Sequence, residues 1–180
     1  MKFVSIALAA ALLTGSAAYA QNPTVGGAEM FPDKPIAVNA SAAPNLTTLV
    51  AAVKAAGLVD TLAGEGPFTV FAPTNEAFAA LPEGTVETLL KPENKDQLTK
   101  VLLSHVVPAN ATAEIAMGMV KDDGGRHNVT TASGDTITLA VQGGKLIVFD
   151  ESSGAATVTQ ADVMQSNGVV HVIDKVLLPK

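Results

Sequence analysis

The fold of this 180-residue chain is decided by the stretch Gly66-Pro67-Phe68-Thr69-Val70-Phe71-Ala72-Pro73-Thr74-Asn75-Glu76-Ala77-Phe78. The run from Phe68 to Ala72 has the apolar and β-branched residues of a short strand, and Pro73 closes it. Phe68, Val70 and Ala72 point to one side of that strand, and Thr69 and Phe71 to the other, so it can be buried on both faces. Thr74 and Asn75 offer short polar side chains to free amides of the next turn, where a helix through Phe78 is expected.

Helical spacing dominates the sequence just before this strand. Leu46, Leu49, Val50 and Val53 fall at i, i+3, i+4 and i+7, which predicts an amphipathic helix. We expect Asn45 to cap this helix and Gly57 to end it. A second short helix is expected over residues 58–62.

Further helices are expected after the strand. Residues 86–90 predict one or two helical turns, and the clearest helix follows Pro92-Glu93-Asn94. Asn94 and Gln97 resemble a capping box at its start. Its apolar face is formed by Leu98, Val101, Leu102 and His105.

The pattern changes to short alternating runs after about residue 125. Gln142-Gly143-Gly144-Lys145, between the runs 136–141 and 146–150, is a strong hairpin signal. The last run, Val169 to Leu178, is apolar on both faces and suits a central strand. Helices thus precede strands, so the predicted class is α+β with a largely antiparallel sheet.

Composition excludes several classes of function. The formal net charge is −6, and no cluster of Lys and Arg is present that could neutralise phosphates, so nucleic acid is not an expected partner. The chain has no cysteine, which excludes thiolate metal sites and cysteine catalysis. No cofactor is expected, because phosphate-binding glycine loops and helical His pairs are missing from the sequence.

The N-terminal residues 1–20 have the pattern of a signal peptide. Lys2 precedes the apolar run Phe3 to Leu13, and Ala18-Tyr19-Ala20 predicts cleavage between Ala20 and Gln21. The apolar run is too short to cross about 30 Å of hydrocarbon, and no later run is long enough to form a transmembrane segment. We therefore expect export to the periplasm or the medium.

Residues 21–38 are expected to be a leader, because Pro and Gly punctuate them and little in them is periodic. Ile36 and Val38 alternate, which predicts an extended arm packed on the domain. The domain itself is expected over residues 39–180.

Three segments together resemble the fasciclin family: residues 66–78, Leu103-Ser104-His105-Val106-Val107, and Asn167-Gly168-Val169-Val170-His171-Val172-Ile173-Asp174-Lys175-Val176-Leu177-Leu178-Pro179. Ser104 stands where the family has tyrosine. The resemblance implies a wedge of two β-sheets with helices packed over one end. It also implies extracellular adhesion or surface interaction, with a protein, cell-surface or matrix partner. The motif residues are interpreted as scaffold, among them Asn167, Gly168 and His171.

Histidine could supply chemistry, and the chain has three. His105 and His171 share apolar faces, so we interpret them as hydrogen-bonded core residues; a metal-ligand or general-base role is the alternative. His127 lies in a polar loop. The adjacent pair Ser104-His105 cannot form a nucleophile and its base, because neighbouring helical residues do not face each other.

Paired carboxylates are a second route to catalysis. The close pairs are Asp122-Asp123 and Asp150-Glu151, and both lie at turn ends, where acids are usually solvated. A glycosidase needs its two acids about 5–9 Å apart across a cleft. We therefore predict that the chain is not an enzyme.

The candidate partner-binding residues are Asp162, Val163 and Met164. They resemble the end of an acidic-hydrophobic peptide that is implicated in integrin adhesion in animal relatives, although Gln160 and Ala161 depart from its beginning. The alternative is a turn in which Val163 and Met164 pack inward.

Two binding functions follow. The leading prediction is an exported adhesion or surface-interaction module, expected to be monomeric. The alternative is a carrier of a small apolar ligand, held between the two sheets in a pocket lined by Met117, Met119 and Met164.

Overall fold

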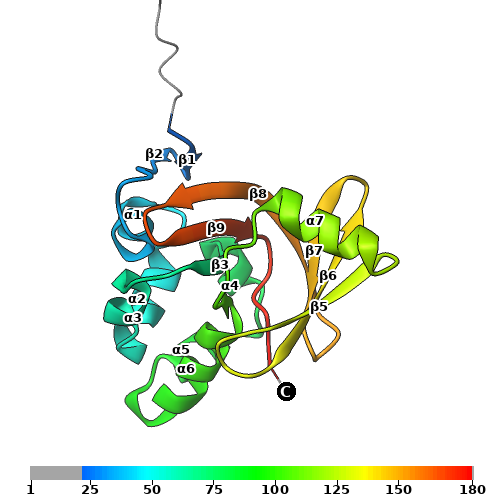
Figure 1. Cartoon of the computed structure of the whole chain (residues 1–180). Helices are drawn as coiled ribbons and strands as arrows, with labels where there is room; N and C mark the ends of the chain where they lie inside the picture. The colour runs from blue at the N-terminus through cyan, green and yellow to red at the C-terminus, as the bar shows by residue number, and fades with distance from the viewer. Residues whose placement is uncertain (1–21, 180) are drawn as a thin grey trace, which may run out of the picture.

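A computed structural model describes residues 22–179, which fold as helices around one large sheet (Figure 1). The predicted signal peptide and its cleavage site lie outside the described residues. The strands are β1 (Thr24–Val25), β2 (Ala28–Glu29), β3 (Phe68–Pro73), β4 (Val106–Val107), β5 (Arg126–Thr130), β6 (Thr136–Gln142), β7 (Lys145–Phe149), β8 (Ala155–Gln165) and β9 (Gly168–Ile173). The helices are α1 (Ile36–Ala42), α2 (Thr47–Ala56), α3 (Val59–Ala63), α4 (Asn75–Ala79), α5 (Thr85–Leu89), the 3₁₀ turn η1 (Pro92–Asn94), α6 (Lys95–Ser104) and α7 (Ala113–Asp122). The predicted α+β class is confirmed.

The large sheet has the strand order β4-β3-β9-β8-β7-β6-β5. Every neighbouring pair is antiparallel except β3 and β9, which run parallel from Phe68 opposite Gly168 to Pro73 opposite Ile173. The first half of β8 pairs with β7, and its second half pairs with β9. The two sheets of the expected wedge therefore share β8 and form one continuous sheet.

Two hydrophobic cores lie on opposite sides of this sheet. The helices α1 to α6 gather on one side of the molecule, and α7 lies over β5 to β7 on the other (Figure 1). The helix-side core contains Val25, Met30, Ile36, Ala43, Leu46, Leu49, Ala52, Val53, Ala56, Leu62, Val70, Ala72, Ala77, Phe78, Leu98, Val101, Leu102, Val106, Val163, Val170, Val172 and Val176. The sheet-side core contains Phe71, Val107, Ala116, Val120, Ile137, Leu139, Leu146, Val148, Ala156, Val158, Ile173 and Leu177.

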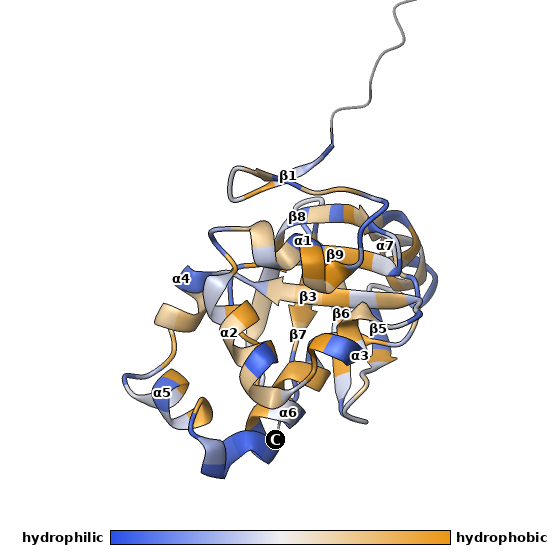
Figure 2. Ribbon diagram, turned by 90° about the vertical axis from the view of Figure 1, so that its left-hand side faces the viewer, coloured by the Kyte–Doolittle hydropathy of each residue, from blue (hydrophilic) through white to orange (hydrophobic). Residues whose placement is uncertain are grey.

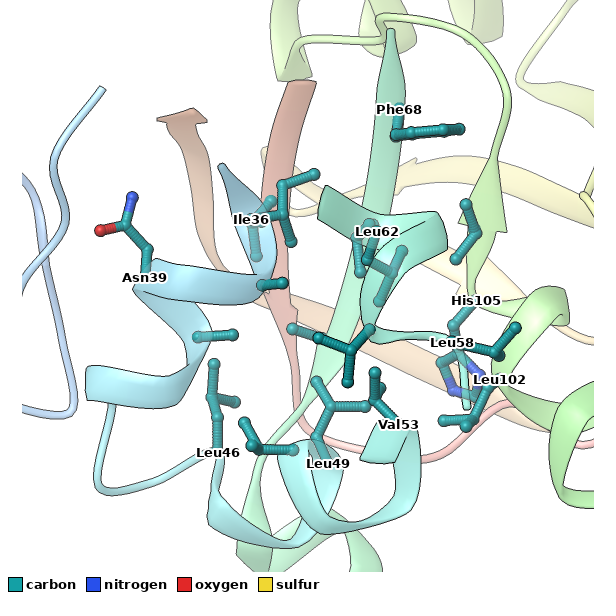
Figure 3. Close-up of a pocket in the computed structure, with 18 of the residues that line it drawn as sticks. Ile36, Asn39, Leu46, Leu49, Val53, Leu58, Leu62, Phe68, Leu102 and His105 are labelled. Atoms are coloured by element: carbon teal, nitrogen blue, oxygen red, sulfur yellow. The ribbon is translucent and has the colours of Figure 1, made fainter. Parts of the chain in front are cut away.

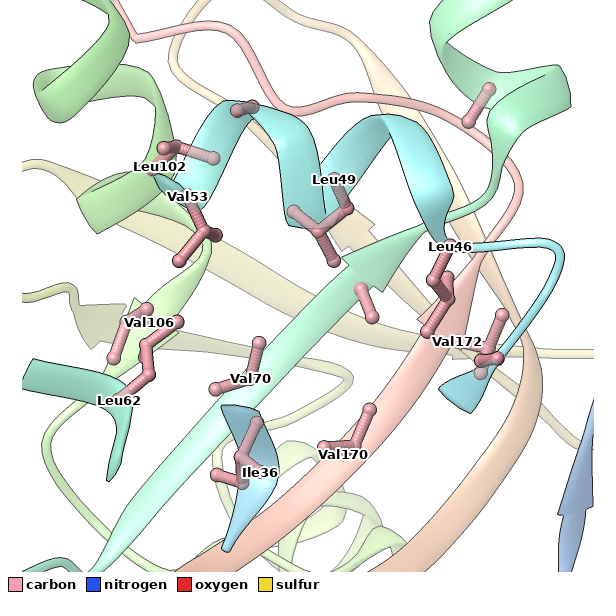
Figure 4. Close-up of a cluster of buried hydrophobic side chains, with 14 of the residues drawn as sticks. Ile36, Leu46, Leu49, Val53, Leu62, Val70, Leu102, Val106, Val170 and Val172 are labelled. Atoms are coloured by element: carbon pink, nitrogen blue, oxygen red, sulfur yellow. The ribbon is translucent and has the colours of Figure 1, made fainter. Parts of the chain in front are cut away.

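Strand β3 separates these cores as its sequence predicts. Val70 and Ala72 belong to the helix-side core, and Phe71 belongs to the sheet-side core. Val70 and Val170 lie on neighbouring strands below α2, which places Leu49 and Val53 above them (Figure 4). Strand β9 is buried between β3 and β8, as expected for a central strand, but it ends at Ile173 rather than continuing to Leu178.

The polar residues after β3 connect two helices. Thr74 caps α4, since its hydroxyl accepts a hydrogen bond from the Ala77 amide at 3.3 Å. Asn75 acts on a different helix from the expected one: its Oδ1 accepts from the Thr48 amide at 3.0 Å, at the start of α2. Asn45 does not cap α2, because the N-cap position is occupied by Leu46. Gly57 ends α2 in a left-handed conformation, as predicted.

Two other expectations about helices are wrong, and one helix was not expected. Residues 36–42 form α1 rather than an extended arm, because Ile36 and Asn39 are buried at i and i+3 while Val38 is exposed. The capping box at α6 is absent, since Asn94 Nδ2 donates instead to Thr88 O at 2.7 Å. Helix α7 was not predicted.

Hydropathy along the ribbon follows this arrangement, with apolar segments concentrated in the strands and on the helices that cover them (Figure 2). Within residues 22–179, we find no helix with the length and apolar character needed to cross a membrane.

Candidate binding surfaces

The predicted partner-binding residues lie inside strand β8, not in a turn before a strand. The pairing of β8 with β9 is irregular between Gln160 and Val163, and this bulge contains Asp162. Val163 is fully buried in the helix-side core. Asp162 is exposed and Met164 is 41% exposed, so Met164 does not pack inward. Two of the three candidates therefore face solvent.

Asp162 has a backbone conformation that is unusual for a residue with a side chain. Its φ is 56°, in the left-handed region, which Asp tolerates better than most residues. Its Oδ1 accepts a hydrogen bond from the Ala113 amide at 2.7 Å, at the first residue of α7. The bulge therefore connects β8 to α7.

His171, on the neighbouring strand β9, supports the same bulge through a hydrogen bond. It is fully buried, its Nδ1 accepts from the Asp162 amide at 3.2 Å, and its Nε2 lies 2.8 Å from Ala111 O. Only the neutral tautomer with the proton on Nε2 makes both bonds. Burial lowers the pKa of His171, while the hydrogen bond to Ala111 and the charge of Asp162 act in the opposite direction.

In His105 the two ring nitrogens have the opposite roles: Nδ1 carries the proton and Nε2 accepts a hydrogen bond. Its Nδ1 lies 2.7 Å from Val101 O, and its Nε2 accepts from the Leu177 amide at 2.9 Å. Burial lowers the pKa of His105 to about 4, so the ring is neutral at pH 7. Both ring nitrogens are used by the backbone, and the ring connects α6 to the C-terminal segment. The structure gives His105 and His171 separate partners and does not pair them.

Asn167 and Gly168 form a junction between four elements. Asn167 Nδ2 donates to Leu62 O and Gly64 O, both at 2.8 Å, and its Oδ1 accepts from the Ile36 amide at 3.0 Å. A side chain at Gly168 would collide with the carbonyl of Phe68 on the parallel strand. The two residues therefore position α1 and α3 against the start of β3 and β9.

Of the two acidic pairs, Asp150 and Glu151 bind backbone amides. Asp150 accepts from the amides of Gly154 at 2.6 Å and Leu178 at 2.9 Å, and Glu151 accepts from Thr136 at 2.9 Å. The side chain of Asp123 has a different partner, because its Oδ2 lies 2.5 Å from His127 Nδ1. No group of three or more His, Cys, Asp or Glu side chains within residues 22–179 is arranged to hold a metal ion.

An apolar cavity of about 90 Å³ lies in the helix-side core, between the helices and β3 (Figure 3). Leu49, Val53, Leu62 and Phe68 contribute to its wall. The expected lining by Met117, Met119 and Met164 is wrong. Met117 packs against the sheet-side core, and the other two side chains are exposed. The methionine in the wall is Met30, which no sequence pattern selects.

Comparison with known proteins decides the family. The fasciclin domain model matches residues 44–179. The chain belongs to the fasciclin family. Protein sll1483 of Synechocystis sp. is 49% identical to it over 172 residues, which cover 87% of this chain and 88% of that protein. Immunogenic protein MPB70 of Mycobacterium bovis is 37% identical over 172 residues, covering 92% of this chain and 80% of the relative.

Animal fasciclin proteins are also similar. The pig transforming growth factor-beta-induced protein ig-h3 is 40% identical over 136 residues, which are 73% of this chain but 17% of that protein. The solved FAS1 domain pair of the insect cell adhesion molecule fasciclin I has a TM-score of 0.72 and 18% identity. The match covers 81% of this chain and about half of that structure, at 51%. It confirms the fold.

The fasciclin match begins after the N-terminal segment that contains β1, β2 and α1. Val25 and Met30 from this segment are 1% and 2% exposed and line the cavity. Asn39 bonds to Phe31 and Gln165. Val25 and Met30 could not be selected from the sequence, because two isolated apolar side chains among glycines and prolines have no periodicity.

Proposed function

We propose that this fasciclin domain is an exported surface-interaction module that binds a protein or envelope component. The site proposed is the exposed part of β8 at Asp162 and Met164. The observation that carries the proposal is the exposure of these two side chains at the bulge, on either side of Val163, which anchors the strand in the core. Unusual backbone conformations in a well-supported frame are frequent at binding sites.

Chemistry at this surface suits a partner with both charged and apolar groups. Asp162 supplies a carboxylate and Met164 a flexible, polarisable side chain that adapts to different contacts. Helix α7, joined to Asp162 through Ala113, adds two further exposed apolar side chains one turn apart, Ile115 and Met119. Export is supported by the signal-like residues 1–20, and adhesion by the resemblance to a cell adhesion molecule.

Capture of partners from the host's own envelope fraction tests this function. Met164→Lys is expected to reduce capture at least tenfold, and Val141→Lys, at a side chain of similar exposure on β6, is the matched control. Asp162→Asn keeps an acceptor for the Ala113 amide and tolerates the left-handed backbone, so it removes the charge alone. Equal capture by Met164→Lys and Val141→Lys contradicts the proposed surface.

A second candidate function is the transport of a small apolar molecule, which the cavity favours. Its wall is almost entirely apolar, but about 90 Å³ is well below the roughly 300 Å³ of a typical ligand pocket. The expected ligand therefore has few heavy atoms, unless the helices move apart. Native mass spectrometry of the protein from its own host is the test. A chain that always has its bare mass contradicts this function.

A further inference from the structure

An open groove lies beside the proposed surface, at the end of the sheet where β8 turns into β9. Its volume is about 480 Å³, and Met164 forms part of its wall. The rest of the wall comes from Pro35, the loop between α3 and β3, Asn110 and the β8–β9 turn. Typical ligand sites have roughly 300–1,000 Å³, so the groove can hold a short peptide segment. The exposed Met164 side chain therefore borders a shaped site.

The two loops that form most of the groove are fixed to each other. Asn167 Nδ2 donates a hydrogen bond to Gly64 O at 2.8 Å, and the Phe68 amide donates to Asn167 O at 3.1 Å. A side chain at Gly66 would collide with the carbonyl of Asn167, so the two main chains are in direct contact. A site built in this way loses little conformational freedom when a ligand binds.

Glu65 gives the groove its charge. It is the one charged residue among the described residues that line the site. Its side chain is exposed and makes no hydrogen bond or ion pair within residues 22–179. Lys34, which precedes Pro35, directs its Nζ to the Phe31 ring instead, 4.4 Å from the ring centre. The groove therefore offers a carboxylate that has no cationic partner in this part of the chain.

The surface around this carboxylate is largely apolar. Pro35, Pro67 and Met164 contribute hydrocarbon and thioether atoms to the wall. Lysine and arginine side chains match such a combination, because their aliphatic stems cover apolar surface while the cationic head binds a carboxylate. A neutral side chain would leave the carboxylate unpaired, and an acidic side chain would be repelled by it.

We propose that the groove binds a lysine or arginine side chain from an extended segment of a partner protein. Glu65 is the counterion of this side chain, and Met164 packs against its aliphatic stem. Asp162 adds a second exposed negative charge to the proposed surface, and the net charge of −6 favours the approach of a basic segment. The inference rests on the proposed surface-interaction function and narrows its partner to a protein with an exposed basic segment.

Three short peptides test the groove directly. The first is acetyl-Ala-Ala-Lys-Leu-Ala-amide, and the other two have norleucine or glutamate in place of the lysine. Each is added to ¹⁵N-labelled protein at pH 7, and the amide signals of Glu65, Asn110 and Met164 are followed. The lysine peptide should shift these signals with a Kd on the order of 1 mM, and the norleucine peptide should bind about tenfold more weakly.

Charge reversal separates an ion pair from a structural role of Glu65. Glu65→Gln keeps the size of the side chain and should bind the lysine peptide about tenfold more weakly than the wild type. Glu65→Lys should prefer the glutamate peptide to the lysine peptide. Glu93→Gln, at an exposed glutamate of η1 outside the groove, is the matched control and should bind like the wild type.

The peptide titrations can overturn the inference in two ways. Equal affinity for the lysine and norleucine peptides would mean that the groove does not recognise a charge. Absence of shifts at Glu65, Asn110 and Met164 with the lysine peptide would mean that the groove is not its site.

Capture from the envelope fraction separates this inference from the proposed function. If Met164→Lys reduces capture and Glu65→Gln does not, the proposed surface stands and the basic-segment partner is wrong. If Met164→Lys does not reduce capture, the proposed surface itself is wrong. Loss of capture with both variants, and normal capture with Glu93→Gln, is the result expected from the inference.

Discussion

The two cores differ in how completely their side chains fill the space between elements. The cavity of about 90 Å³ lies in the helix-side core, and its described wall includes no member of the sheet-side core. In the sheet-side core, strands place apolar residues at every second position, and paired residues such as Leu139 and Val148 lie directly opposite each other. In the helix-side core, α1 has seven residues and α3 has five.

This difference shows how element type affects packing. A regular sheet repeats its side-chain positions, so neighbouring strands interdigitate under α7. Short helices joined by turns do not repeat in this way, and their side chains meet around a void. We therefore expect the sheet-side core to be sensitive to small changes in volume and the helix-side core to tolerate them.

The largest expected effect separates the two cores directly. Leu139→Ala should lower the free energy of unfolding by about 4 kcal/mol, because a fully buried and close-packed side chain is lost. Leu49→Ala should cost about 2 kcal/mol, since Leu49 borders the void and the short helices around it can shift. Urea unfolding of both variants at pH 7 measures the difference. Equal losses would mean that the cavity does not loosen its surroundings.

Acid should destabilise the protein through the residue that connects the cores. His105 lines the cavity, and its ring binds the amide of Leu177, a member of the sheet-side core. The pKa of His105 is about 4 in the folded chain, against an ordinary value of 6.5 for histidine, so the unfolded chain binds more protons between these values. Stability is complete above about pH 6.5 and falls as the pH decreases toward about 4. His105 alone should cost about 2 kcal/mol at pH 5.

His105→Gln is the matched variant for this pH dependence. It should be less stable than the wild type at pH 7, because the ring's two backbone bonds are changed. Its free energy of unfolding should, however, decrease less between pH 7 and pH 5, since one titrating group is gone. Parallel pH profiles for the variant and the wild type would assign the acid sensitivity to other groups.

Adding a methylene group should have opposite consequences in the two cores. Val148→Ile introduces volume where the side chain is 0% exposed and should cost about 1–2 kcal/mol. Val170→Ile extends toward the cavity and should be neutral or stabilise the protein by up to about 1 kcal/mol. Thermal unfolding of the pair at one pH measures this contrast. A stabilised Val148→Ile variant would show that the sheet-side core also contains unfilled space.

The sequence predicted the elements whose pattern depends on near neighbours. Strand β3, helix α2 up to Gly57 and the β6–β7 hairpin have clear local signals, and Gly143 and Gly144 take the positive φ values that the hairpin requires. Helix α7 was missed because Ile115 and Met119 lie on its exposed side, so the apolar residues do not form one stripe. Its start was nevertheless marked by Thr112, whose hydroxyl accepts from the Ile115 amide.

The candidate surface was only partly readable from the sequence. Asp162, Val163 and Met164 were selected together, but successive residues of a strand point to opposite faces, so Val163 is buried while Asp162 and Met164 are exposed. A bulge in the strand contains Asp162. A bulge depends on the register between β8 and β9, which neighbouring residues do not specify. The cavity was not predictable either, because its wall combines the N-terminal segment before α1, four helices and four strands. Long-range contacts of this kind appear only when the whole fold is assembled.

The smallest expected change in stability comes from two glycines. Gly118 lies within α7, which covers the sheet-side core, and Gly57 lies at the end of α2, in the helix-side core. Gly118 is an exposed residue within α7, and a Cβ at this position meets no atom within 4 Å. Gly118→Ala should therefore stabilise the protein by about 0.5–1 kcal/mol, because alanine loses less backbone entropy in a helix. Gly57 ends α2 with a φ of 74°, so Gly57→Ala should destabilise by about 1 kcal/mol despite the space around it. Differential scanning calorimetry of the two variants separates backbone conformation from packing. If both changes destabilised the protein, α7 would need the flexibility of Gly118. The helix that covers the sheet-side core would then be less rigid than the strands beneath it.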